Sequence, residues 1–225
     1  MRSGVIALAT CAALALTAPA TAVTVYDNGL PNTVDGNDAT EWVQAEDFSF
    51  GSATTITGAG VYLAGFDGIG TYDGGFQYYL FADGGGIPGA VLQTGDVSPV
   101  ITDSGLPWCC GGNAYLFAFD FDTAFDADAG AIYYLGIHAA NAGDFGRDDI
   151  YWVTTDLNAT NPGVESDFGT FDNWFTNFNE HAFFLTGGDV VPDVPEASTW
   201  LMMIGGLAAA GAAMRRRRRV SVSFV

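Results

Sequence analysis

The chain has 225 residues, with 26 acidic and only 7 basic side chains, and a net charge of −19 at neutral pH. Between Val23 and Asp193 there are 25 acidic residues and one basic residue, Arg147. This balance supplies no cations to replace phosphate counterions, so it excludes a nucleic-acid-binding function. Aromatic residues make up 14% of the chain, which indicates a packed core rather than a disordered polymer.

The first 22 residues have the pattern of a secretory signal peptide. Arg2 precedes an apolar stretch over residues 5–16, and small residues follow over residues 18–22. Such a segment directs a chain to the Sec machinery and is then removed, here after Ala20 or Ala22. We therefore expect an exported protein.

Residues 23–190 are expected to form one domain, in which apolar and polar residues alternate with the period of β-strands. The pattern predicts strands over residues 23–26, 46–50, 54–64, 76–81, 90–94, 114–121, 131–138, 150–155 and 182–186. The Gly- and Pro-rich segment 83–89 predicts a hairpin connection between two of them. The expected fold is all-β, an antiparallel β-sandwich of jelly-roll type.

Segment 114–121 has the clearest alternation. One face carries the aromatic residues Tyr115, Phe117, Phe119 and Phe121. Asp120 and Asp122 then lie on the opposite face, because successive strand side chains point in opposite directions. We expect the aromatic face to be buried.

Four aspartates gather at the end of this strand and in the turn after it: Asp120, Asp122, Asp126 and Asp128. Carboxylate oxygens are the ligands that Ca²⁺ prefers, although the spacing does not match an EF-hand loop. Two interpretations follow, a Ca²⁺ site or a solvated acidic surface. We expect no other cofactor.

Cys109 and Cys110 are neighbours in the sequence, directly after Trp108. Thiols outside the cytoplasm tend to be oxidised, so the two residues are either a vicinal disulfide or free thiols. Zinc is not expected, because the pair lacks the usual two-residue spacing and no histidine is close in sequence.

Aromatic and amide residues interleave over residues 168–184. Aromatic faces beside amides and carboxylates suit a polysaccharide, which presents apolar C–H faces and hydroxyl edges. The candidate glycan contacts are Trp108, Trp174 and Phe175. The alternative is that these rings belong to the core or close one end of the sandwich.

Enzymatic motifs are missing from the sequence. It has no Gly-x-Ser-x-Gly elbow, Gly-rich phosphate loop or His-Glu-x-x-His helix, so we expect a protein without catalytic activity. A glycosidase needs only two carboxylates about 5 to 9 Å apart, and a sequence with so many acidic residues leaves that alternative open.

Residues 191–225 have three parts. The first is the motif Val194, Pro195, Glu196, Ala197 and Ser198. An apolar run over residues 200–214 follows, and it ends at Arg215, Arg216, Arg217, Arg218 and Arg219. As a helix the apolar run would rise about 22 Å, against a hydrocarbon core of about 30 Å. We predict a short transmembrane helix with the arginines in the cytoplasm and the folded domain outside.

This three-part tail resembles the PEP-CTERM sorting signal of exopolysaccharide-producing Gram-negative bacteria. The resemblance implies that a membrane-embedded exosortase recognises the tail and processes it near the Pro-Glu motif. It also implies an inner-membrane intermediate and a final place at the cell-envelope surface or in the extracellular matrix. In addition, Glu46-Asp47-Phe48 and residues 87–89 and 129–137 resemble recurrent elements of anchored bacterial surface β-sandwich modules.

The expected function is therefore a non-catalytic binding or structural module of the exopolysaccharide or biofilm matrix. The expected partners are the exosortase, the Sec machinery, the membrane before processing and an exopolysaccharide. One alternative is a hydrolase that acts on polysaccharide through a carboxylate pair. Another is a purely structural acidic module that associates with Ca²⁺.

Overall fold

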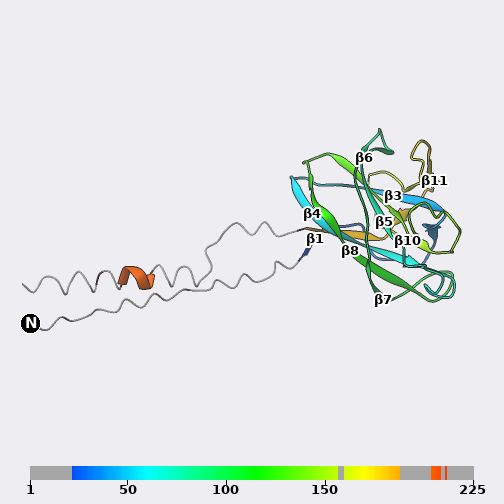
Figure 1. The fold of residues 1–225 in the computed structure, drawn as a ribbon, viewed down its shortest axis with the longest axis horizontal. Coiled ribbons are helices and arrows are strands. Elements are labelled where there is room, and N and C mark those ends of the chain that lie inside the picture. Colours follow the sequence, from blue (N-terminus) through cyan, green and yellow to red (C-terminus); the bar gives the residue numbers. More distant parts are fainter. Residues whose placement is uncertain (1–21, 157–159, 188–203, 209–210, 212–225) are drawn as a thin grey trace, which may run out of the picture. The chain divides into compact units, whose positions relative to one another are not determined.

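The structure is a computed structural model that describes residues 22–156, 160–187, 204–208 and 211. The chain divides into two units, Met1–Asp189 and Val190–Val225. The first unit is all-β, and its described residues form fourteen strands in two antiparallel sheets (Figure 1).

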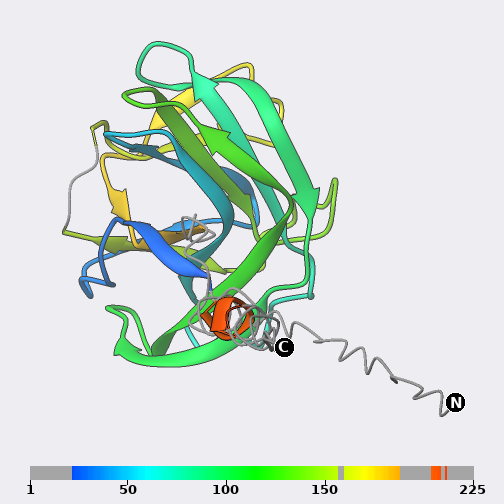
Figure 2. The same cartoon turned by 90° about the vertical axis from the view of Figure 1, so that its left-hand side faces the viewer.

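The first sheet is built around the long pair β4 (Thr54–Ala64) and β8 (Asn113–Ala127). Its strand order is β1 (Val23–Asp27), β14 (Phe183–Gly187), β4, β8 and β7 (Val100–Pro107). The end of β4 also pairs with β10 (Tyr151–Thr155), which carries β2 (Gly36–Asp38) and β13 (Glu180–His181). Figure 2 shows this part of the domain from the side of β1.

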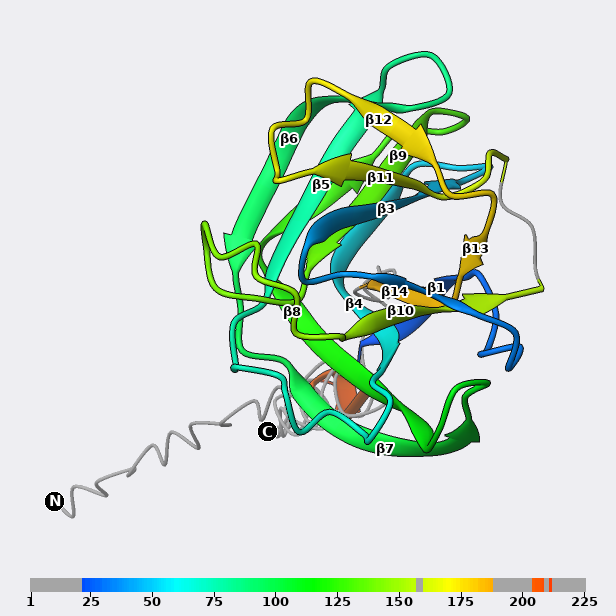
Figure 3. The same cartoon turned by 90° about the vertical axis from the view of Figure 1, so that its right-hand side faces the viewer.

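The second sheet has six strands. Their order is β12 (Trp174–Thr176), β11 (Val164–Asp167), β3 (Trp42–Ser49), β9 (Ile132–His138), β5 (Gln77–Asp83) and β6 (Pro88–Asp96). In Figure 3, β12 and β11 lie in yellow at the top of the view. One edge of the sheet is thus the β11–β12 hairpin and the other is β6.

The two sheets share one core. Phe48, Leu80 and Leu135 from the second sheet pack in the same cluster as Phe117 and Phe183 from the first, and all five are at most 1% exposed. A buried aromatic or aliphatic side chain of this size contributes about 1.5 to 3 kcal/mol through the hydrophobic effect. The core therefore holds the sheets face to face as a sandwich.

The predicted alternation along β8 is confirmed. Phe117, Phe119 and Phe121 face the core and are at most 7% exposed, whereas Asp120 and Asp122 are exposed. The predicted hairpin is confirmed as well, since β5 and β6 pair up to Asp83 opposite Pro88.

Each of the nine predicted strands corresponds to a strand of the structure. The structure adds five that the pattern did not predict: β2, β7, β11, β12 and β13. β2, β12 and β13 have only two or three residues, too few for a periodic pattern. β7 is interrupted by a register shift between Asp103 and Leu106, where Gly105 takes a φ of 68°.

Ala22 apart, the predicted signal peptide over residues 1–22 lies outside the described residues. The predicted tail helix over residues 200–214 also lies outside them, except for residues 204–208, which are helical, and residue 211. In the part of the chain that the structure describes, no helix is long and apolar enough to cross a membrane.

Candidate functional site

Most of the aromatic segment of the sequence lies in the outermost hairpin of the six-stranded sheet, whereas its last residues enter β13 and β14 of the first sheet. β11 pairs with β3 through Val164 opposite Ala45, and β12 pairs only with β11 among the described strands. We call residues 164–178 the aromatic hairpin (Figure 3).

Two rings attach the aromatic hairpin to the outer face of its own sheet. Trp174 contacts Phe81 edge to face with ring centroids 5.4 Å apart, and Phe171 contacts Phe81 at 5.1 Å. Trp174 and Phe171 stack on each other at 5.8 Å. Trp174 is half-buried by these contacts, and its indole N–H has no hydrogen-bond partner among the described residues.

Three phenylalanines of the hairpin instead point into solvent. Phe168 is 52% exposed, Phe175 is 53% exposed and Phe178 is 82% exposed. Phe168 also lies over Trp42, with ring centroids 6.5 Å apart and planes 20° from parallel. These exposed rings are surfaces on which a flat apolar group can stack.

The hairpin has an unusual backbone at three of its phenylalanines. Phe168, Phe171 and Phe178 have φ angles of 48°, 57° and 61°. In this left-handed region the Cβ of a bulky residue is crowded by the backbone, at a cost of about 1 to 3 kcal/mol per residue. Such strain concentrates at ligand-binding segments, where the rest of the fold holds the residue in place.

Polar side chains beneath the hairpin fix its position. The side-chain amide of Gln44 on β3 donates to a carboxylate oxygen of Glu165 at 3.1 Å and accepts from the Asn177 amide at 3.0 Å. The Ser166 hydroxyl accepts from the backbone N–H of Phe171 at 3.2 Å. These hydrogen bonds thus hold the segment that carries the strained phenylalanines in place.

Of the three predicted glycan contacts, Phe175 is exposed, Trp174 is half-buried and Trp108 is buried at 6% exposure. The Trp108 indole N–H donates to the carbonyl of Asp35 at 3.2 Å. Its ring stacks on Tyr151 with centroids 5.4 Å apart. Trp108 is therefore a packing residue, because its polar atom and its ring already have partners within the domain.

Cys109 and Cys110 form a vicinal disulfide in the turn between β7 and β8. The backbone N–H of Trp108 donates to the carbonyl of Gly112 across this turn at 3.2 Å. Both cysteines are exposed.

Three aspartates of the predicted Ca²⁺ site, Asp120, Asp122 and Asp126, lie on β8, and Asp128 follows it; all four are exposed. Asp126 accepts a hydrogen bond of 2.6 Å from the Thr55 hydroxyl. Among the described residues, no group of three or more His, Cys, Asp or Glu side chains is placed to hold a metal ion.

Arg147, the single basic residue of the domain, is paired with acidic neighbours. Its Nε lies 2.8 Å from Asp149 and 3.6 Å from Asp38, and its Nη2 donates to the Tyr151 hydroxyl at 2.8 Å. The pairing lowers the pKa of Asp149. Arg147 is thus already paired with residues of its own domain.

Both histidines of the domain are buried. His138 lies 2.7 Å from the carbonyl of Thr40 and stacks on Phe145, and burial lowers its pKa. His181 contacts Glu46 between the sheets, with both side chains fully buried. Neither histidine faces solvent, so neither is placed for acid–base chemistry on a bound polymer. Sequence reasoning missed the Glu46–His181 pair because 135 positions separate the two residues.

The remaining observation concerns the C-terminal segment. The family model of the PEP-CTERM protein-sorting motif matches residues 193–219. The chain carries a PEP-CTERM sorting signal. This match covers the Pro195-Glu196 motif, the apolar run and the five arginines. No curated protein matches the chain.

A PEP-CTERM signal marks its carrier as an exported, envelope-associated protein that an exosortase-type enzyme processes. The predicted family resemblance is thereby confirmed. The signal says where the protein is sent, and the function of the sandwich domain is a separate question.

Proposed function

We propose that this PEP-CTERM protein is a non-catalytic module that binds and organises the exopolysaccharide matrix outside the cell. The observation that carries the proposal is the aromatic hairpin, which holds Phe168, Phe175 and Phe178 exposed, two of them, Phe168 and Phe178, on a strained backbone. Its position on the edge of the sheet leaves these rings accessible to a long polymer. The signal peptide delivers the chain to the inner membrane, and processing of the tail releases it to the surface or matrix.

The chemistry of the domain favours an uncharged polysaccharide. Between Val23 and Asp193 there are 25 acidic residues and a single arginine, which is already paired. A surface with this charge repels anionic polymers. Exposed aromatic rings instead recognise the apolar C–H faces of neutral sugars.

The alternatives have less support. For a hydrolase, Glu46 is a carboxyl whose pKa is raised by burial, as a general acid requires. Its side chain, however, is fully buried and occupied by His181, which leaves no place for substrate or water. For a Ca²⁺-associating module, the aspartates of β8 form no metal-binding group among the described residues.

We also propose that the sandwich is a jelly roll. Four strands of the first sheet run in the order β1, β14, β4 and β8, and four strands of the second in the order β3, β9, β5 and β6. Two interleaved Greek keys produce such orders. The additional strands β10 to β13 are inserted between β9 and β14, and two of them, β11 and β12, form the aromatic hairpin.

The test compares polymer binding by the full-length chain and a hairpin variant, in a detergent without a sugar headgroup. We expect the wild type to bind the producer's own exopolysaccharide, and neutral dextran more strongly than anionic alginate. Replacing the rings in Phe175→Ala/Phe178→Ala should weaken binding at least tenfold, because stacking contacts are worth about 1 kcal/mol or more each.

The matched control is Leu92→Ala/Val100→Ala, which removes two exposed apolar side chains outside the hairpin. This control should bind like the wild type in isothermal titration calorimetry. Equal binding by the hairpin variant and the wild type, or no binding by the wild type to the producer's exopolysaccharide, would contradict the proposal.

A further inference from the structure

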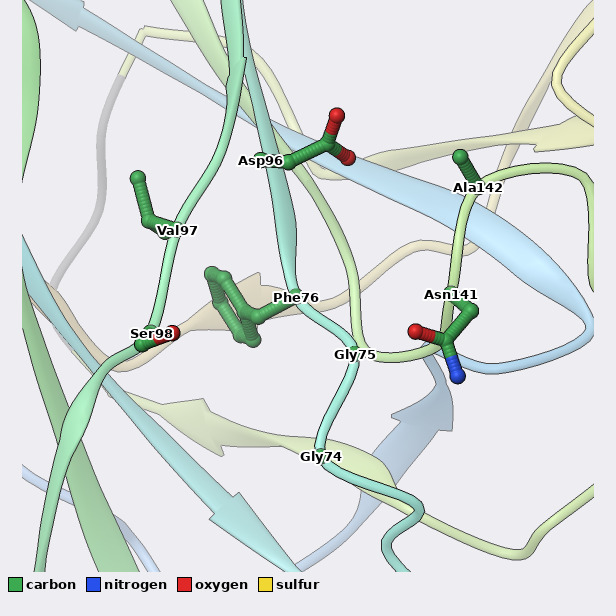
Figure 4. Close-up of a pocket in the computed structure, with 8 residues that line it drawn as sticks. All are labelled: Gly74, Gly75, Phe76, Asp96, Val97, Ser98, Asn141 and Ala142. Atoms are coloured by element: carbon green, nitrogen blue, oxygen red, sulfur yellow. The ribbon is translucent and has the colours of Figure 1, made fainter.

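A pocket of about 310 Å³ lies at one end of the sandwich, apart from the aromatic hairpin. Its walls come from three connections: residues 74–76 before β5, residues 96–98 at and after the end of β6, and residues 141–142 after β9 (Figure 4). These connections meet because Gln77 on β5 is opposite both Asp96 and His138. The volume is at the lower end of the range for small-molecule sites.

The walls of this pocket are fixed to one another. The backbone N–H of Val97 donates to the carbonyl of Phe76 at 2.9 Å. The Asp73 carboxylate accepts from the Gly75 N–H at 2.8 Å through one oxygen and from the Asn141 amide through the other. Gly75 lies so close to the backbone of Asn141 that a Cβ there would clash. The pocket is therefore formed before any ligand arrives, which reduces the entropy cost of binding.

Unused hydrogen-bond acceptors line the pocket. Gln77 occupies one oxygen of Asp96 at 2.8 Å, and the other oxygen has no protein donor among the described residues. The same is true of the Ser98 hydroxyl and the Asn141 side-chain carbonyl within residues 22–156 and 160–187. A ligand that satisfies these atoms must bring hydrogen-bond donors.

Phe76, Val97 and Ala142 supply apolar atoms to the lining, which Gly74 and Gly75 complete. An ammonium ion would satisfy the acceptors but gain nothing from these carbons, and an anion would be repelled by Asp96. A sugar ring offers both hydroxyl donors and a C–H face.

We propose that this pocket binds one neutral hydroxylated sugar residue, such as a chain end or side branch. Only the assignment of that sugar to the matrix polysaccharide rests on the proposed function. Asp96 and Asn141 accept from its hydroxyls, Ser98 donates or accepts, and the apolar wall contacts its C–H face.

Saturation-transfer NMR on the full-length chain tests this pocket with glucose, galactose and mannose, and with glucuronate as the anionic comparison. The detergent again carries no sugar headgroup. We expect at least one neutral sugar to give a signal and glucuronate to give none. Asp96→Asn should weaken the binding about tenfold, because a hydrogen bond to a charged group becomes a neutral one. Ala142→Phe, at an exposed position, should abolish binding by filling the pocket.

Asp128→Asn is the matched control, since it makes the same charge change at an exposed site outside the pocket. It should bind sugar like the wild type. The absence of a signal from all three neutral sugars, or unchanged binding by Ala142→Phe, overturns this inference. Polymer binding by the same Ala142→Phe variant then distinguishes the two proposals, because the proposed function predicts that the intact aromatic hairpin still binds the polymer.

Discussion

The carboxyl group of Glu46 and the imidazole of His181 are in contact between the two sheets. His181 Nδ1 lies 2.9 Å from Glu46 Oε2, and its Nε2 lies 3.1 Å from the Asn37 side-chain oxygen. Burial raises the pKa of Glu46 and lowers the pKa of His181 to about 3. A protonated Glu46 that donates to Nδ1, with the Nε2 proton donated to Asn37, satisfies every contact without a buried charge.

This neutral pair predicts a pH dependence of the free energy of unfolding. The raised pKa of Glu46 contributes stability that is lost as pH rises above 4.5, the ordinary pKa of a glutamate. The lowered pKa of His181 contributes stability that is lost as pH falls below 6.5, the ordinary pKa of a histidine. The two slopes cancel between these values. Above pH 6.5 only the Glu46 loss remains, with a slope of up to about 1.4 kcal/mol per pH unit.

Urea unfolding between pH 6.5 and 8.5 measures this slope. In Glu46→Gln the slope should disappear, because the amide does not titrate. The same decline in both proteins would show that Glu46 is ionised in the folded domain.

Among the elements of the fold, the aromatic hairpin exposes its phenylalanine rings at a cost in stability. Phe168, Phe171 and Phe178 occupy left-handed φ angles that glycine adopts without steric cost. The hairpin keeps this backbone because Trp174 and Phe171 hold it on the sheet. Its two ends are fixed by pairing with β3 and by the Gln44 hydrogen bonds.

Replacing the most exposed of these residues, Phe178→Gly, should therefore stabilise the domain by about 1 kcal/mol. The ring is 82% exposed, so little packing is lost. Thermal unfolding should show a higher melting temperature together with weaker polysaccharide binding. The comparison variant is Phe175→Gly, at a strand position outside the left-handed region, which should lower the melting temperature. A lower melting temperature for Phe178→Gly would argue against strain.

For the whole molecule, the proposed function implies that export and processing determine which chain reaches the matrix. Five of the seven basic residues are Arg215 to Arg219, and a sixth is Arg2. Removal of both ends leaves Arg147 as the sole cation of the released domain. The strongly acidic surface then keeps the protein soluble and away from anionic polymers.

Mass spectrometry of the protein recovered from the cell surface tests the processing. The recovered chain should lack Arg215 to Arg219, with its new end near the Pro195-Glu196 motif. A Pro195→Ala/Glu196→Ala variant should keep its tail and stay in the membrane fraction. Recovery of the intact tail from the wild type would indicate a permanent anchor instead.

The sorting signal and most of the strands can be predicted from the sequence. Both are local patterns: the tail is read from consecutive residues, and the long strands show a two-residue period because one face is buried. Along β8, the alternation of phenylalanine and aspartate was enough to assign the buried face.

What the individual side chains do depends on the tertiary structure. In the fold, Trp108 is buried, Phe178 is exposed, Glu46 contacts His181, and three connections surround a pocket. None of this is local, because the partners lie tens to more than a hundred residues apart in the chain. Burial and contact are set by which strands pair across the two sheets, and a one-dimensional pattern contains the period of a strand but not the identity of its neighbour.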